Sequence, residues 1–226
     1  MKTTVSLLAV ALPALAMSAS AQANAPTLFS GFASSLEGWT KVAEQTTSIS
    51  HAPSSGNPGG YARNSDQGPS AGDILAPPSW LGDWRGYEGG RLSWDFRLFS
   101  PGVNDGSPFL PTVATLTGPG GTAVFTSTIL PTVAAGWYAN SVPMHAVSWT
   151  VTGGTWAGVL TNVTEFKLQI EAVFSTGFPG EVTGIDNVML SPVPEPASAL
   201  LLALGLGCCG AAIGLCAQPG RAKAQR

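Results

Sequence analysis

The chain has 226 residues, of which 10% are charged and 44% are hydrophobic, and its formal net charge is −3. Soluble domains have about 25% charged residues, and without a long basic run the chain does not have the charge pattern of a nucleic-acid-binding protein. Residues 24–191 hold all seven Trp, six Lys or Arg, twelve Asp or Glu and no Cys, so their net charge is −6. This block is long enough to bury a core, whereas both ends of the chain are apolar.

The first 23 residues have the pattern of a secretory signal peptide. Lys2 and the amino terminus supply positive charge, residues 5–17 are apolar, and small residues follow up to Ala23. This order predicts cleavage after Ala23 and export of the remaining chain. The alternative is an uncleaved membrane helix, which the shortness of the apolar run disfavours.

Period-two alternation dominates residues 24–191. Residues 91–98 alternate between apolar and polar side chains, which places Trp94 in the core. Residues 165–174 alternate in the same way, which places Glu165 and Glu171 in water. A third strand is predicted at 185–190. Weaker strand candidates are residues 46–51, 61–64, 113–116, 123–127 and 146–151.

These short strands, separated by dense Gly and Pro turns, favour antiparallel sheets with one wet face. The fold class expected is therefore all-β, an antiparallel jelly-roll β-sandwich. The only helical turn expected is at 155–160, where Thr155 can act as the N-cap. Because the block has no Cys, it must be held together by packing.

An ordered set of short motifs resembles the laminin B domain, also called laminin IV type A. The resemblance spans about residues 29–191. The motifs that carry it include Glu37-Gly38-Trp39, Trp80-Leu81-Gly82-Asp83, Gly89-Gly90-Arg91-Leu92-Ser93-Trp94-Asp95 and Gly184-Ile185-Asp186-Asn187-Val188. The resemblance implies a sandwich similar to galactose-binding-like modules, which bind glycans or proteins and usually do no chemistry.

One Gly-rich loop gathers aromatic and polar residues in the way that a glycan platform requires. Trp80, Trp84 and Tyr87 lie in it with Asp83, and these four residues form the candidate ligand patch. The alternative is that the aromatic side chains cover the end of the sandwich as packing. The resemblance favours a structural role for Trp80 and Asp83, since both belong to the domain pattern.

The same resemblance implies a possible structural calcium ion. Related sandwiches hold calcium between an acidic residue near the first strand and an Asp in the last strand, and Asp186 matches the latter. Glu37 can supply the former only if its loop folds back. The alternative, which we favour, is that Asp186 caps a turn through backbone hydrogen bonds. No other cofactor is expected.

The sequence offers little for catalysis. His51 and His145 are the only histidines, and neither has metal ligands at zinc spacing. Glu165 and Glu171 are expected on a wet strand face, where they are better explained as surface charge than as a glycosidase pair. We therefore expect no enzyme, with a glycoside hydrolase as the least favoured function.

The carboxyl-terminal region, residues 192–226, resembles the PEP-CTERM sorting signal of Gram-negative bacteria. It consists of the motif 193–198 with Pro194, Glu195 and Pro196, an uncharged segment 197–217 long enough for a transmembrane helix, and a basic tail 218–226. The resemblance implies processing by an exosortase, a membrane enzyme of bacteria that make extracellular polysaccharide. The alternative is a plain tail anchor.

These features together predict an exported protein, first anchored in the cytoplasmic membrane and then sorted to the cell surface or beyond. Its favoured role is a non-catalytic structural or adhesive component of the extracellular polysaccharide matrix of a biofilm. The alternative is a specific carbohydrate-binding module. The expected partners are the exosortase, the membrane, and extracellular polysaccharide or surface proteins.

Overall fold

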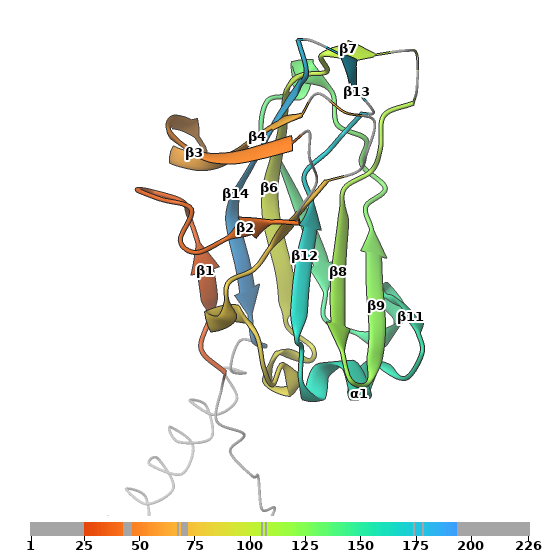
Figure 1. The fold of residues 1–226 in the computed structure, drawn as a ribbon. Coiled ribbons are helices and arrows are strands. Elements are labelled where there is room, and N and C mark those ends of the chain that lie inside the picture. Colours follow the sequence, from red (N-terminus) through yellow and green to blue (C-terminus); the bar gives the residue numbers. More distant parts are fainter. Residues whose placement is uncertain are drawn as a thin grey trace, which may run out of the picture.

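A computed structural model of the chain describes residues 25–193, apart from residues 43–46, 67, 69–71, 105, 107, 174 and 178. The predicted signal peptide and the Pro194, Glu195 and Pro196 motif, with the segments that follow it, lie outside the described residues. The described part forms two antiparallel β-sheets packed face to face (Figure 1). The all-β, two-sheet sandwich expected from the sequence is thus observed.

The first sheet has the strand order β10-β6-β14-β4-β3, and β1 pairs with β14 beside this path. Its strands are β1 (Leu28–Ser30), β3 (Thr47–Gly56), β4 (Gly59–Asp66), β6 (Arg91–Ser100), β10 (Tyr138–Pro143) and β14 (Glu181–Ser191).

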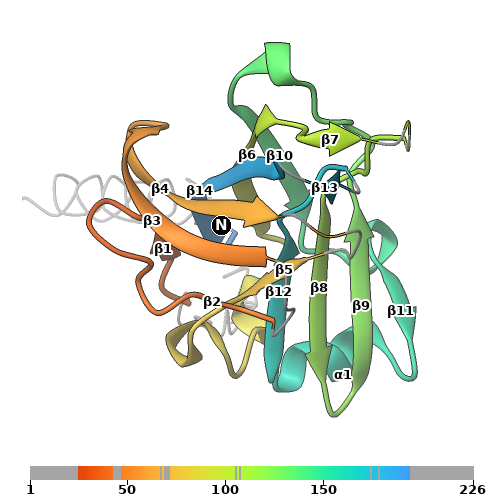
Figure 2. The same ribbon diagram turned by 45° about the horizontal axis from the view of Figure 1, so that its top comes forward.

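The second sheet has the order β11-β9-β8-β12-β5-β2, and a separate pair joins β7 to β13. These strands are β2 (Thr40–Lys41), β5 (Asp73–Leu75), β7 (Val103–Asn104), β8 (Val113–Gly118), β9 (Gly121–Thr126), β11 (Thr150–Thr152), β12 (Glu165–Gln169) and β13 (Ser175–Gly177). Figure 2 shows β3, β4, β14, β6 and β10 on one side of the sandwich, and β12, β8, β9 and β11 on the other.

The strongest strand prediction is confirmed by β6, in which Leu92, Trp94, Phe96 and Leu98 are buried and the residues between them are not. The strand predicted at 146–151 is instead mostly a short 3-10 helix, η4 (Ala146–Ser148), followed by β11. The helical turn is observed as α1 (Trp156–Thr161), and the Thr155 side chain accepts a hydrogen bond from the Gly158 N–H at 3.1 Å. This bond satisfies one of the free donors at the start of the helix.

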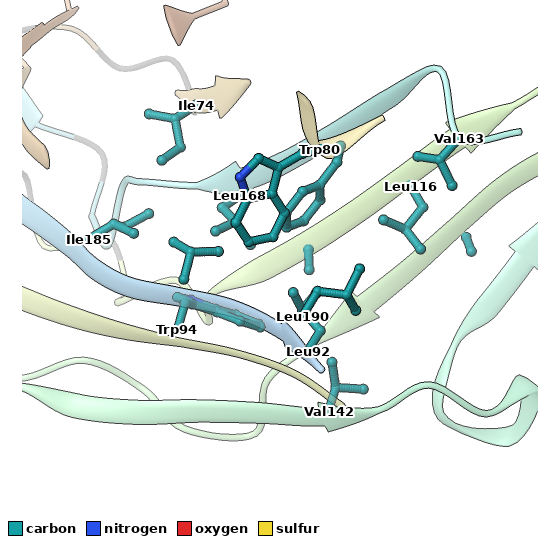
Figure 3. Close-up of a cluster of buried hydrophobic side chains, with 14 of the residues drawn as sticks. Ile74, Trp80, Leu92, Trp94, Leu116, Val142, Val163, Leu168, Ile185 and Leu190 are labelled. Carbon is teal, nitrogen blue, oxygen red and sulfur yellow. The ribbon is translucent and has the colours of Figure 1, made fainter. Parts of the chain in front are cut away.

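The core lies between the two sheets. Figure 3 shows Trp94, Ile185 and Leu190 from the first sheet facing Ile74, Leu116 and Leu168 from the second. At one end of this core, Trp39 makes edge contacts with Trp80 and Phe166, with ring centroids 5.4 and 5.7 Å apart. Edge-to-face aromatic pairs add stability beyond the area that they bury. These contacts therefore help to stabilise a domain that has no Cys and so no disulfides.

Glu171 departs from the prediction made for its strand. Strand β12 ends at Gln169, and beyond that point the backbone bends, so the alternation of faces does not continue. Glu171 consequently turns into the protein and is completely buried, whereas Glu165, inside the strand, remains partly exposed. The prediction that Glu171 faces water is therefore wrong.

Glu171 joins Asp66 and Glu181 in a cluster of three fully buried carboxyl groups, which we call the carboxyl cluster. The pKa of Glu171 is raised to about 9, mainly by burial and in part by the neighbouring Asp66 and Glu181. Burial also raises the pKa of Glu181 to about 8, although the N–H groups of Ala172 and Val173 donate to Glu181 Oε1 at 2.7 and 3.1 Å and oppose the shift. The cluster therefore holds protons at neutral pH.

Strand β1 begins and strand β14 ends at the same end of the sandwich, the lower end in Figure 1. There the Tyr87 hydroxyl donates to the Pro26 carbonyl at 2.6 Å, and Val193 lies beside Gly89. No helix among the residues described between 25 and 193 is long and apolar enough to cross a membrane.

Candidate functional site

Three of the four residues of the sequence-predicted ligand patch lie in the core. Trp80, Trp84 and Tyr87 are 4%, 1% and 4% exposed, and the Trp84 indole donates to the Trp80 carbonyl at 2.7 Å. Their loop folds over the end of the sandwich and places both Trp rings against Phe166 and the Tyr87 ring against Trp84, so they present no open face to a ligand. The structure thus supports packing, the alternative explanation, for these aromatic side chains.

Asp83, the fourth member of the patch, is exposed and pairs with Arg85. The two side chains make a salt bridge of 2.6 Å, and hydrogen bonds from Arg85 lower the pKa of Asp83 to about 2. The pair remains in solvent beside the buried aromatic rings and does not form a joint surface with them.

Asp186 is fully buried and fixes the loop between β3 and β4 to the outer face of the first sheet. Its carboxylate accepts the N–H groups of Asn57 at 2.6 Å and Asn187 at 2.8 Å. Asp95 accepts the side-chain amides of the same two residues, at 3.0 and 2.8 Å. Burial is the main cause that raises the pKa of Asp186, and the two backbone N–H groups oppose it.

These bonds are those expected of an Asp that caps a turn. Glu37, the other candidate calcium ligand, is exposed, although it is near enough for its charge to raise the pKa of Asp186. Within the part of the chain that the structure describes, no three His, Cys, Asp or Glu side chains are placed to hold a metal ion together. His51 lies 2.9 Å from the Phe32 carbonyl through its Nε2.

The outer face of the first sheet carries a second aromatic group, which sequence reasoning did not single out. Tyr61 on β4, Phe99 on β6 and Trp137 just before β10 have ring centroids 5.1 to 5.8 Å apart. Strand register brings them together around Gly184, which pairs with Arg63 on one side and Arg97 on the other. We call these three rings the outer aromatic cluster.

Gly184 provides the space that the rings occupy. A Cβ atom at this position would lie 2.7 Å from the Tyr61 ring and 2.8 Å from the Trp137 ring. The Trp137 indole also donates to the Ser55 carbonyl at 2.9 Å, so the end of β3 holds the ring in place. Tyr61 is buried beneath its neighbours, whereas Phe99 and Trp137 remain partly exposed.

Arginine side chains surround the outer aromatic cluster. The Arg97 guanidinium lies over the Phe99 ring, 4.4 Å from its centroid, which is a cation–π geometry. Burial raises the pKa of the Tyr61 hydroxyl, and the positive charges of Arg63 and Arg97 oppose this shift. The site therefore combines ring faces with fixed positive charge.

The outer face of the second sheet has a different character. Its outward side chains on the central strands are polar or aliphatic; they are Val113, Thr115, Thr117, Thr122, Val124, Glu165, Lys167 and Gln169. Since outer faces of antiparallel sheets are ordinarily polar, this sheet needs no special explanation. The aromatic face of the first sheet is the exception that marks a candidate binding site.

One signal for this site was present in the sequence. The alternation of residues 91–98, continued by one residue, puts Phe99 on the same polar face as Arg97. An aromatic residue on a wet face is a sign of binding. Trp137 gave no such signal, because it lies just before a strand that the sequence pattern did not predict.

This architecture defines the chain as a two-sheet antiparallel β-sandwich that is similar to carbohydrate-binding modules and to a laminin L4 domain. No protein-family profile matches the sequence, and a comparison with curated proteins gives no match. The likenesses are to solved structures of low sequence identity, and they concern the fold.

The family 11 carbohydrate-binding module from Clostridium thermocellum, solved with a β-1,3-1,4-mixed-linked tetrasaccharide, has a TM-score of 0.49 and 16% identity, over 75% of this chain and 98% of that chain. The L4b domain of human laminin α2 has a TM-score of 0.42 and 9% identity, over 55% of this chain and 71% of that chain. TmCBM27, a carbohydrate-binding module that recognises mannan, has a TM-score of 0.39 and 14% identity, over 75% of this chain and all of that one.

Proposed function

We propose that the sandwich is a non-catalytic glycan-binding module and that its ligand lies on the outer face of the first sheet. The observation that carries the proposal is the outer aromatic cluster, with Phe99 and Trp137 partly exposed beside Arg63 and Arg97. A pyranose ring presents C–H groups that pack on an aromatic face and hydroxyl groups that hydrogen-bond to nearby polar side chains. Binding sites combine apolar surface and convergent polar groups in this way.

We further propose that the module acts outside the cell, as an adhesive or structural component of an extracellular polysaccharide matrix. What supports this is the sequence of the two ends, which has the pattern of a signal peptide and of an exosortase sorting signal. The two ends of the described domain also emerge together, and a single membrane attachment would leave the sheet faces accessible. N-terminal sequencing of the exported chain should begin at Asn24, and deletion of 194–196 should block its sorting.

Affinity electrophoresis of the purified full-length chain through gels that contain neutral or acidic polysaccharides tests the binding proposal. We expect at least one polysaccharide to retard the protein. Trp137→Ala should weaken this binding roughly tenfold or more, because it removes a ring face from the centre of the site. Trp137→Phe, which keeps a ring, should retain most of the affinity.

Val147→Ala is the matched surface control, since Val147 is 97% exposed on η4, outside the first sheet. It should bind like the parent chain. Retardation that survives Trp137→Ala unchanged would place the ligand elsewhere, and the absence of retardation by every polysaccharide would contradict the proposal.

A further inference from the structure

The domain has few cations, and their placement is uneven. Residues 24–191 contain six Lys or Arg against twelve Asp or Glu. Arg85 pairs with Asp83, Lys167 pairs with Asp73, and Lys41 is also engaged with a partner. Among the residues that the structure describes, the three remaining cations, Arg63, Arg91 and Arg97, form no ion pair with a carboxylate.

All three arginines point away from the core on the outer face of the first sheet. Arg91 and Arg97 occupy the outward positions of β6, and Arg63 lies across β14 from Arg97. Six residues of strand separate Arg91 from Arg97, which is roughly 20 Å. In an acidic domain, three cations without a carboxylate partner therefore gather on one sheet face beside the outer aromatic cluster. Asp95, at the outward position of β6 between Arg91 and Arg97, is occupied by the side-chain amides of Asn57 and Asn187.

Arg97 also has an unfilled hydrogen-bonding position. Its Nε is buried and has no hydrogen-bond partner in the described part of the chain, while its guanidinium lies over Phe99. A guanidinium presents its donors as a planar fork that matches a carboxylate in a bidentate pair. A buried donor left without a partner is costly, so the described part of the chain does not satisfy the Arg97 side chain by itself.

Resting on the glycan-binding function proposed above, we infer that the ligand of this face is an anionic polysaccharide whose carboxylate groups bind Arg63, Arg91 and Arg97. The sugar rings lie on Phe99 and Trp137, and the carboxylates meet the arginines along β6. The acidic remainder of the domain then contributes to selectivity. It repels an anionic polysaccharide, so such a chain binds favourably only where it reaches the three arginines.

The test compares polygalacturonate with its carboxyl-reduced form, a matched neutral polymer, on the purified full-length chain. We expect polygalacturonate to bind at least tenfold more tightly, and its binding to weaken as ionic strength rises. Arg97→Gln should weaken binding about tenfold or more, as the loss of a hydrogen bond to a charged group does. Arg85→Gln is the matched control, because it removes one arginine from outside the face, and it should change binding less than twofold.

Arg91→Gln provides a second variant that does not depend on the aromatic packing, since Arg91 is exposed and its guanidinium donates to the Ser141 hydroxyl at 2.8 Å. Thermal unfolding of each variant separates a loss of binding from a loss of fold. Equal binding of poly-L-glutamate would overturn the inference that the ligand is a saccharide.

Binding of a neutral glycan that depends on Trp137 but not on Arg91 or Arg97 would overturn this inference and leave the proposed function standing. If polygalacturonate does not bind while such a neutral glycan does, the inference of an anionic ligand is likewise overturned and the proposed function stands. No binding of any polysaccharide would contradict both.

Discussion

Single residues in this protein acquire their properties from where the backbone turns. Glu165 and Glu171 are both Glu at odd positions of one alternating segment, yet only Glu165 remains in the strand and near solvent. Glu171 meets two other carboxyl groups, those of Asp66 and Glu181, in the core. The chemical difference between them is therefore produced by the end of β12.

The carboxyl cluster makes the stability of the fold depend on pH. The pKa values of about 9 for Glu171 and about 8 for Glu181 lie above the value of about 4.3 for an exposed Glu. The folded chain thus binds these protons more tightly than the unfolded chain does. The stability contributed by these protons is complete below about pH 4.5 and is lost progressively as the pH rises to about 9.

Glu171→Gln removes one of these protonation equilibria and keeps the shape of the side chain. We expect a smaller decline in the free energy of unfolding between about pH 6 and pH 9, and a gain of about 1 kcal/mol or more at pH 8. Urea denaturation at several pH values measures both. Glu165→Gln, on the exposed face of β12, should leave the pH dependence as it is; an equal effect of the two substitutions would contradict the role of the cluster.

At the scale of elements, β14 organises both sides of the first sheet. Its inward residues complete the core, and its outward Gly184 makes room for the outer aromatic cluster. Two residues further along, Asp186 fastens the loop between β3 and β4 to the same face. One strand therefore sets the position of the rings and of the loop that follows β3, whose last residues hold Trp137.

Gly184→Ala should displace the rings without breaking the strand. The added Cβ would lie within 3 Å of the Tyr61 and Trp137 rings, so we expect a loss of about 1–3 kcal/mol in stability from overpacking. Glycan affinity should fall roughly tenfold or more, because the displaced rings no longer match the ligand. Ser93→Ala, on the same face, should change neither quantity, and unaltered affinity in Gly184→Ala would show that the rings are not the binding surface.

The sequence predicted elements best where alternation was long. The pattern of residues 91–98 was enough to place Trp94 in the core. Trp80 and Trp84 lie in a loop without periodicity, so the sequence left both packing and binding open. The contact between Asn57 and Asp186 joins positions 129 residues apart, and no local pattern reports such a pairing. The site could not be predicted because it depends on contacts of this kind.

At the scale of the whole molecule, the described core is complete between residues 25 and 193. Its two sheets cover each other, and the last described residues lie beside Gly89 and Gly90. A chain that ends at Val193 should therefore unfold within about 2 °C of the full-length chain, since both sheets and the core between them are formed by residues that it keeps. Differential scanning calorimetry measures this, and a markedly lower transition would show that residues 194–226 contribute to the fold.

The tryptophans of the protein divide six to one between the interior and the surface. Six of the seven are at most 6% exposed, and Trp137 alone is partly open, on the face that carries the proposed site. The molecule therefore contains its own optical probe. A soluble quencher such as iodide should extinguish the emission of one indole and spare the other six, and a ligand that covers this face should protect that indole. Occupancy can thus be followed on the unlabelled protein.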